Sequence, residues 1–272
     1  MRTVLTPTAE HLDLDAETLD RHPNDDSLEF PDGEVYVQLE GVEDVEDALV
    51  VHSGAPGPNT GLMHLFGTLE LLRENDVDVE VMFTYFPYGM QDEEFFPGTL
   101  NYASSILRKL EEYYRVEEIH AVDAHFAHRD WTSDYGFHNL NSFPWIRDER
   151  GIEDRVVMGP DLGAVERFGI PGFEKERKGS RQVEMKGEMD VEGEDVVVFD
   201  DIIETGTTML EAHDALKEEG AETVEAAAVH GVMEEGVDRV AERFDRLHLT
   251  NTVESEHADV DIEPFLREEL NL

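Results

Sequence analysis

Short apolar runs alternate with longer stretches of helical spacing along most of the 272-residue chain. In the first half, the strand-like runs are residues 34–40, 48–52, 79–85 and 119–122, and the helical stretches are residues 60–74 and 100–114. The second half repeats the theme, with strands at 155–158, 196–199 and 223–229 and a helix at 209–219. This alternation predicts an α/β fold in which mainly parallel sheets are flanked by helices.

The stretch from residue 130 to 150 interrupts the pattern. It has little periodicity and carries the turn-forming residues Asn139, Asn141 and Pro144. A chain of this length favours two domains, because single domains usually contain roughly 100–200 residues. We therefore place the predicted junction here, with domains at 1–140 and 141–272.

The charge of the chain is strongly acidic. Asp and Glu number 65 against 21 Lys and Arg, a formal net charge of −44. Such a field repels polyanions, so neither nucleic acid nor a membrane is an expected partner. We interpret the acidity as a halophilic adaptation to a salt-rich cytoplasm, because counterions shrink the Debye length to about 3 Å at 1 M.

Two further properties limit the class of protein. No apolar run is long enough for a membrane helix and the first residues lack an apolar signal core, so a cytoplasmic protein is expected. The chain has no cysteine, which excludes disulfides, thiolate zinc sites and a cysteine nucleophile. Any metal ion would need oxygen or imidazole ligands.

The segment after the apolar run 196–199 combines carboxylates with a Thr/Gly-rich loop. Asp200 and Asp201 follow the run directly, and a helix is expected to begin near Thr207. The connecting loop consists of Glu204, Thr205, Gly206, Thr207 and Thr208. Unpaired N–H groups at a helix N-terminus carry partial positive charge, so this loop can hold a phosphate.

The two aspartates suit the rest of such a ligand. Carboxylates at the carboxyl end of a strand can accept hydrogen bonds from the vicinal hydroxyls of a sugar. Phosphate and diol together describe a ribose phosphate. The alternative is that Asp200 and Asp201 are a solvated acidic pair that caps a helix, which is common in so acidic a chain.

The loop resembles the PRPP-binding loop shared by type I phosphoribosyltransferases and PRPP synthetases. Residues 30–37, Phe-Pro-Asp-Gly-Glu-Val-Tyr-Val, are similar to an early motif of the synthetases that phosphoribosyltransferases generally lack. Further segments that resemble the same family are residues 85–92, 122–125, 159–164 and 229–232. The resemblance spans about residues 28–253 and is to the ribose-phosphate diphosphokinase (PRPP synthetase) family.

This resemblance implies two phosphoribosyltransferase-like domains and transfer of diphosphate from ATP to ribose 5-phosphate, giving PRPP and AMP. The first domain would carry the ATP and metal side and the second the ribose-phosphate loop. The implied ligands of ribose 5-phosphate are Asp200, Asp201, Glu204, Thr205, Gly206, Thr207 and Thr208. Those of ATP are Phe30, Asp32, Glu34 and Gln91, those of Mg²⁺ are His125 and Asp161, and the catalytic cations are Lys175 and Arg177.

Some of these residues have simpler explanations. Lys175 and Arg177 could form a solvated face, His125 could be a hydrogen-bonded histidine at a strand end, and Phe30 could be a core residue. In the family, the Phe30 segment meets the adenine of ATP across a subunit interface. The resemblance therefore implies a homo-oligomer, either a dimer or a hexamer.

The chain departs from the family at the segment that would contact the ATP phosphates. Met90 stands where the family has an arginine, and Glu93 and Glu94 add negative charge nearby. Glu204 and Thr207 are milder departures, at places where the family usually has Asp and often Gly. Two alternatives remain open: a ribose-phosphate-binding regulatory paralogue that has lost ATP use, and a PRPP-dependent phosphoribosyltransferase.

Overall fold

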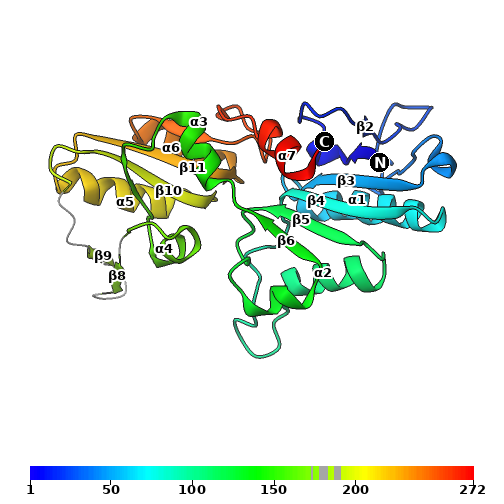
Figure 1. Ribbon diagram of the computed structural model, residues 1–272, viewed down its shortest axis with the longest axis horizontal. Helices are drawn as coiled ribbons and strands as arrows, with labels where there is room; N and C mark the ends of the chain where they lie inside the picture. The colour runs from blue at the N-terminus through cyan, green and yellow to red at the C-terminus, as the bar shows by residue number, and fades with distance from the viewer. Residues whose placement is uncertain (173, 178–182, 187–190) are drawn as a thin grey trace. The chain divides into compact units, whose positions relative to one another are not determined.

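The computed structural model describes residues 1–172, 174–177, 183–186 and 191–272 (Figure 1). The chain divides into two compact units. The first contains Met1–Asn141 and the short return segment Thr252–Glu254, and the second contains Ser142–Asn251 and Ser255–Leu272. Each unit has its own sheet and its own hydrophobic core.

The described part of the first unit contains a six-stranded parallel sheet in the order β2-β1-β3-β4-β5-β6. Its strands are β1 Arg2–Leu5, β2 Glu17–Thr18, β3 Asp47–Ser53, β4 Asp78–Tyr85, β5 Glu118–Val122 and β6 Phe137–Leu140. The central strands β3 and β4 are buried almost throughout, as expected for strands covered on both faces. Short 3₁₀ helices occur at η1 Pro7–Ala9, η2 Val42–Asp44 and η3 Asp130–Asp134.

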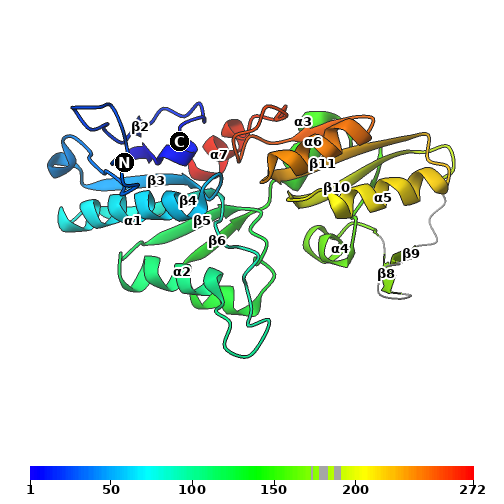
Figure 2. The same ribbon diagram turned by 180° about the vertical axis from the view of Figure 1, so that it is seen from behind.

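Two α-helices connect the central strands of this sheet. Helix α1 (Pro58–Glu74) joins β3 to β4, and α2 (Tyr102–Glu112) joins β4 to β5 (Figures 1 and 2). The apolar side chains of α1 recur at helical spacing and enter the core at Leu62, Leu65, Leu69 and Leu72. Asn101 begins α2 as its N-cap, because its side-chain oxygen accepts a hydrogen bond from Ser104 N at 2.9 Å.

The described part of the second unit contains a four-stranded parallel sheet in the order β12-β11-β10-β7. Its strands are β7 Val156–Met158, β10 Asp195–Ile203, β11 Thr223–Gly231 and β12 Leu247–Leu249. Strands β8 Glu174–Arg177 and β9 Val183–Lys186 form a separate antiparallel pair. The helices are α3 Phe143–Arg150, α4 Leu162–Phe168, α5 Thr207–Glu218, α6 Glu234–Arg243 and α7 Glu263–Leu270.

The two faces of β10 pack against different helices. Val196 and Val198 share a core cluster with residues of α5 and α6, and both views show α5 alongside the sheet (Figures 1 and 2). On the other face, the Phe199 ring lies 4.4 Å from that of Phe143 in α3 and 4.7 Å from that of Phe168 in α4, between ring centroids. The strand is therefore fixed by apolar contacts on both sides.

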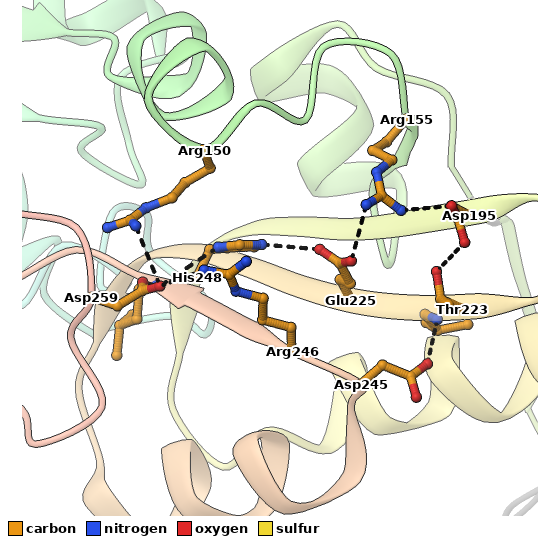
Figure 3. A network of polar contacts seen from close by, with 11 residues as sticks. Arg150, Arg155, Asp195, Thr223, Glu225, Asp245, Arg246, His248 and Asp259 are labelled. Atoms are coloured by element: carbon orange, nitrogen blue, oxygen red, sulfur yellow. Dashed lines mark hydrogen bonds and ion pairs between the residues drawn. The ribbon is translucent and has the colours of Figure 1, made fainter.

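A chain of polar contacts links the strands of the second sheet (Figure 3). Arg155 lies 2.8 Å from Asp195 of β10 and 3.5 Å from Glu225 of β11. Glu225 in turn pairs with buried His248 of β12 at 3.0 Å, and His248 faces Asp259. Burial tends to raise the pKa of Asp259, but the neighbouring His248 and a hydrogen bond from the Leu249 backbone at 3.0 Å outweigh it, and the net pKa is lowered.

The structure confirms the predicted α/β fold class and most of the predicted elements. The strand predicted at 34–40 is wrong: this segment forms only the single antiparallel bridge Glu29↔Val35. The aperiodic stretch 130–150 contains η3, β6 and α3, because its elements are too short to show a period. None of the helices in the described residues is long and apolar enough to cross a membrane.

Candidate functional site

The two aspartates lie inside β10, not after it. The apolar run predicted a strand that ends at Phe199, but β10 continues to Ile203 and pairs with β11 along this extension. Strand β7, on the other side, ends at Met158 opposite Val198. The aspartates therefore lie where one neighbouring strand has stopped. This is the carboxyl end of a parallel sheet, where α/β folds bind ligands.

Both aspartates are buried and share one cation. Asp200 is 7% exposed and Asp201 is 2% exposed. Arg167 of α4 donates from Nη2 to Asp201 Oδ1 at 2.7 Å and to Asp200 Oδ1 at 3.2 Å. Asp200 Oδ1 also accepts from Asp201 N at 2.9 Å. The alternative of a solvated acidic pair does not describe these residues.

The electrostatics of the pair is dominated by desolvation. Burial raises the pKa of Asp200 well above its usual range, and the neighbouring charges of Asp201 and Asp161 raise it further, while Arg167 lowers it. The ionised form of Asp200 therefore costs folding free energy. Unfavourable buried charge of this kind is typical of functional sites.

The loop after β10 leads directly into α5, as predicted. Gly206 is the N-cap of α5 with φ 71°, and no side-chain cap and no acidic residue stands in the first turn. Thr205 Oγ1 bonds Thr207 Oγ1 at 3.1 Å, and residues 204, 205 and 207 are exposed. A helix N-terminus without a carboxylate cap suits an anionic ligand, so the loop has the geometry to hold a phosphate.

Helix α6 holds this loop from behind. A Cβ on Gly236 would lie 1.8 Å from Glu204 O, and one on Gly206 would lie 2.8 Å from Gly236 O. Arg239, one turn further along α6, donates to Thr205 O at 2.7 Å. The close backbone approach requires glycine at both positions, and it fixes the path of the loop.

The residues predicted to contact ATP lie on turns of the first unit. Phe30 N donates to Glu34 O at 2.8 Å, and Asp32 Oδ1 accepts from Glu34 N at 3.2 Å, which closes a tight turn. Phe30 is 39% exposed and touches His22 and Tyr36 edge-on, so it is not a core residue. Asp32 and Glu34 are exposed, and Glu34 lines an open pocket with residues of α1.

Gln91 is exposed and follows Met90, the last residue of a largely buried turn of this unit. Its neighbour Asp92 is only 2% exposed and accepts two hydrogen bonds from Arg129, at 2.7 Å from Nε and 3.2 Å from Nη2. Arg129 also lies 3.5 Å from Glu93. A guanidinium is therefore present beside the segment whose expected arginine is replaced by Met90.

The two predicted metal ligands belong to different units. His125 is half-buried in the segment that follows β5, and Asp161 is the N-cap of α4, with Oδ1 accepting from Ala164 N at 3.1 Å. Within the described residues, no group of three or more His, Asp or Glu side chains could hold a metal ion. Whether either residue binds Mg²⁺ stays a prediction.

The predicted catalytic cations lie on β8. Lys175 pairs with Met185 and Arg177 with Val183 in the antiparallel register of β8 and β9. Their side chains lie outside the described part of the chain. The structure thus places the backbone of both residues on a short hairpin, and their role stays a prediction.

Sequence reasoning missed the residues that support the site. Arg167, Gly236 and Arg239 contact the carboxylates or the loop from neighbouring helices. The scarcity of basic residues was the available signal for Arg167, six positions after Asp161. Gly236 lies within a helix, where glycine is disfavoured. A glycine at such a position often indicates a close packing contact, and this was the available signal for Gly236.

Comparisons with known proteins find relatives along most of the chain. Residues 172–263 match the family model described as phosphoribosyl transferase domain. The ribose-phosphate pyrophosphokinase of Thermococcus kodakarensis is 32% identical over 255 residues, covering 87% of this chain and 88% of the relative. That of Pyrococcus furiosus is 31% identical over 287 residues, covering 96% and 97%.

A solved structure extends the likeness to the whole fold. The crystal structure of phosphoribosylpyrophosphate synthetase from Mycobacterium smegmatis matches with a TM-score of 0.78 at 23% identity, covering 100% of this chain and 98% of that one. At this identity the match concerns the fold, which is that of two phosphoribosyltransferase-like units. The two archaeal relatives are 32% and 31% identical to the chain and cover most of its length. The chain therefore belongs to the ribose-phosphate pyrophosphokinase family.

Proposed function

We propose that this protein is a ribose-phosphate diphosphokinase that transfers diphosphate from ATP to C1 of ribose 5-phosphate, giving PRPP and AMP. The observation that carries the proposal is the buried pair Asp200 and Asp201, which lies just before the glycine-capped N-terminus of α5. The names of the archaeal relatives support the same reaction. No finding favours either alternative, the regulatory paralogue or the phosphoribosyltransferase.

The second unit would bind the acceptor sugar. The 5-phosphate would accept hydrogen bonds from the 205–208 backbone and from threonine hydroxyls, and the 2- and 3-hydroxyls would donate to Asp200 and Asp201. Binding at both ends fixes the ring and presents the C1 hydroxyl. The C1 hydroxyl gives up its proton to solvent as its oxygen bonds to the β-phosphorus of ATP, the bond from that phosphorus to the α-phosphate oxygen breaks, and AMP leaves.

The chain would contribute positioning and charge rather than a covalent intermediate. Lys175 and Arg177 on the β8 hairpin would stabilise the negative charge of the transferring group. Phe30, Asp32, Glu34 and Gln91 would bind the nucleotide. We add Arg129 to this group, because its guanidinium lies beside Asp92 and supplies positive charge where Met90 supplies none.

Mg²⁺ fits the residues present. It prefers oxygen ligands, and usually takes one or two protein carboxylates together with substrate phosphates. Asp161 offers such a carboxylate, while His125 would act more naturally through water or a hydrogen bond. The ion would neutralise charge on the diphosphoryl group. The lack of a ready three-ligand group among the described residues agrees with a metal that arrives with the nucleotide.

We also propose that the protein works as a homo-oligomer. The turn with Phe30, Asp32 and Glu34 is exposed, and the pocket that Glu34 lines with residues of α1 is open, so an adenine bound there would stay partly exposed within this unit. A second copy could supply an enclosing wall. Light scattering at high salt would test this, and a monomer at the enzyme concentration used for activity would contradict it.

The activity is tested by mixing ribose 5-phosphate, ATP and Mg²⁺ with the protein in molar KCl and measuring AMP by chromatography. The proposal expects AMP and PRPP in equal amounts. Other nucleoside triphosphates, tested in parallel, would reveal an altered donor. If no donor yields a monophosphate while calorimetry detects ribose 5-phosphate binding, the regulatory paralogue is the correct reading.

A further inference from the structure

Arg167 is the least expected residue of the ribose site. Its guanidinium contacts both buried carboxylates through the same nitrogen, Nη2, and its side chain is 14% exposed. Its Nε is also buried and makes no hydrogen bond. The two hydrogen bonds from Nη2 are thus directed at the carboxylate pair.

The fold around Arg167 fixes its position. Helix α4 begins at the N-cap Asp161 and ends at Gly169, whose φ is 63°. The Phe168 ring packs edge-on against Phe199 of β10 at 4.7 Å. A Cβ on Gly163 would lie 2.9 Å from Arg167 Nη1, so the absence of a side chain there leaves space for the guanidinium. Helix α4 and β10 therefore hold the contact from both ends.

The charges around the pair explain what the cation does. Adjacent buried carboxylates repel each other, and Asp161 adds a third negative charge. On β11, Ala228 lies opposite Asp200 and the nearest titratable residue is His230, opposite Ile202. Burial and Asp201 raise the pKa of Asp200, whereas Arg167 lowers it. A protonated carboxyl offers a sugar hydroxyl fewer acceptor positions, so ionisation decides how well the diol binds.

We propose that Arg167 is a positioning residue of the ribose 5-phosphate site, which holds the carboxyl groups of Asp200 and Asp201 in one orientation and favours their charged form so that they accept the sugar hydroxyls. This inference rests on the proposed function. It assigns to α4 a direct part in substrate affinity, although Arg167 touches the carboxylates and not the sugar.

The test compares wild type with Arg167→Gln and Arg167→Lys. Ribose 5-phosphate affinity is measured by calorimetry without nucleotide, from pH 5 to pH 9 in molar KCl. At low pH, affinity should fall as the carboxyl becomes protonated, and this fall is called the acid side of the binding profile. Loss of the cation raises the carboxyl pKa, so the acid side should move to higher pH in the Gln variant. Affinity at pH 7 should fall by roughly 10-fold, because a carboxyl pKa moved by about one unit changes the ionised fraction by up to about tenfold.

The Lys variant keeps the charge and should restore the position of the acid side, with weaker binding because the guanidinium geometry is lost. Arg243→Gln is the matched control: it removes the same charge from an exposed pair with Asp214 in the same unit. Its profile should overlay wild type. If Arg167→Gln does not fold, judged by circular dichroism, the Lys variant alone decides, and a profile shape equal to wild type with about 10-fold weaker binding is then expected.

The outcomes separate two failures. Equal weakening at every pH in Arg167→Gln, with the acid side unmoved, would overturn the inference and leave Arg167 a structural residue. In that case wild type still binds the sugar. If wild type itself does not bind ribose 5-phosphate at any pH, the proposed function fails first, and the inference falls with it.

Discussion

Asp200 and Asp201 are buried and hydrogen-bonded within the second unit, whereas the nucleotide candidates of the first unit lie on exposed turns. Helices α4 and α6 contact the carboxylates and the loop from their own unit. The Phe30 turn is closed by its own backbone and the Asp32 side chain, and Phe30 contacts the rings of His22 and Tyr36 edge-on. The second unit thus holds the groups proposed to bind the sugar in a built arrangement, whereas those proposed for the nucleotide are exposed, and Glu34 lines an open pocket.

This difference separates recognition of the sugar from recognition of the nucleotide. Ribose 5-phosphate should bind to groups already in place, with little ordering cost. The nucleotide should bind through groups that need Mg²⁺, a second copy or substrate to complete them. Changes in the second unit should therefore affect the sugar strongly and specifically, and changes in the first unit should affect the nucleotide more weakly.

The largest effect is expected from Asp200→Asn. Loss of the carboxylate should lower kcat/KM for ribose 5-phosphate roughly 100-fold or more, because a site built to bond hydroxyls depends on these groups. Steady-state kinetics at saturating ATP measures this. The exposed Asp214→Asn removes one charge from the same unit and should leave kcat/KM unchanged.

The same variant should be more stable than wild type at neutral pH. The pKa of Asp200 is raised by burial, so the stability contributed by its protonated form is lost as pH rises through that folded-state value. Asparagine mimics the neutral form. In thermal melts, the melting temperature of the variant should be a few degrees above that of wild type at pH 8 and about equal to it at pH 4. A melting temperature below that of wild type at pH 8 would contradict the account.

A smaller effect is expected from Gly236→Ala. The new methyl group would meet Glu204 O at 1.8 Å, so the loop must move. Overpacking of this kind costs about 1–3 kcal/mol, and the affinity for ribose 5-phosphate should fall about 10-fold. Glu235→Ala on the same turn adds no such contact. Equal affinities for the two variants in calorimetry would mean that α6 does not fix the loop.

Arg129→Gln tests the nucleotide side. The KM for ATP should rise about 3- to 10-fold, because a charge-assisted contact is lost, while the KM for ribose 5-phosphate stays constant. The variant also leaves buried Asp92 unpaired and should be less stable. The double variant Asp92→Asn with Arg129→Gln should regain stability but not ATP affinity. Recovery of both would show that Arg129 acts only through folding.

The smallest effect on binding is expected from salt. With a net charge of −44, the protein should melt at a higher temperature in molar KCl than in dilute buffer, because screening reduces self-repulsion. The KM for ATP, beside exposed Glu93 and Glu94, should respond to KCl more than the KM for ribose 5-phosphate. Equal melting temperatures in the two buffers would remove the halophilic interpretation.

Much of the fold could be predicted because the apolar residues of its helices and strands recur with a clear period. The helix at 60–74 and the strand at 79–85 correspond to α1 and β4 within two residues. The segment 34–40 alternates polar and apolar residues but forms no strand, since a tight turn and a single bridge satisfy its backbone. An alternation of polar and apolar residues predicts which side chains would share one face of a strand, but it does not show that a neighbouring strand is available for pairing.

The site could be predicted only where its residues are contiguous. Asp200 to Thr208 are neighbours along the chain, so the strand, loop and helix pattern revealed them together. Arg167 and Gly236 reach the same place from separate helices, and this depends on tertiary packing. The strand was expected to stop at the aspartates because charged residues rarely lie inside a strand. Here Arg167 offsets part of the cost of their burial.

The most direct test of the central claim follows the label of γ-³²P-ATP in a reaction of wild-type protein with ribose 5-phosphate and Mg²⁺. The account predicts that the label appears in PRPP while unlabelled AMP forms in equal amount, since the diphosphate moves as a unit. Label in a sugar bisphosphate with release of ADP, or label that stays in ATP, would contradict it.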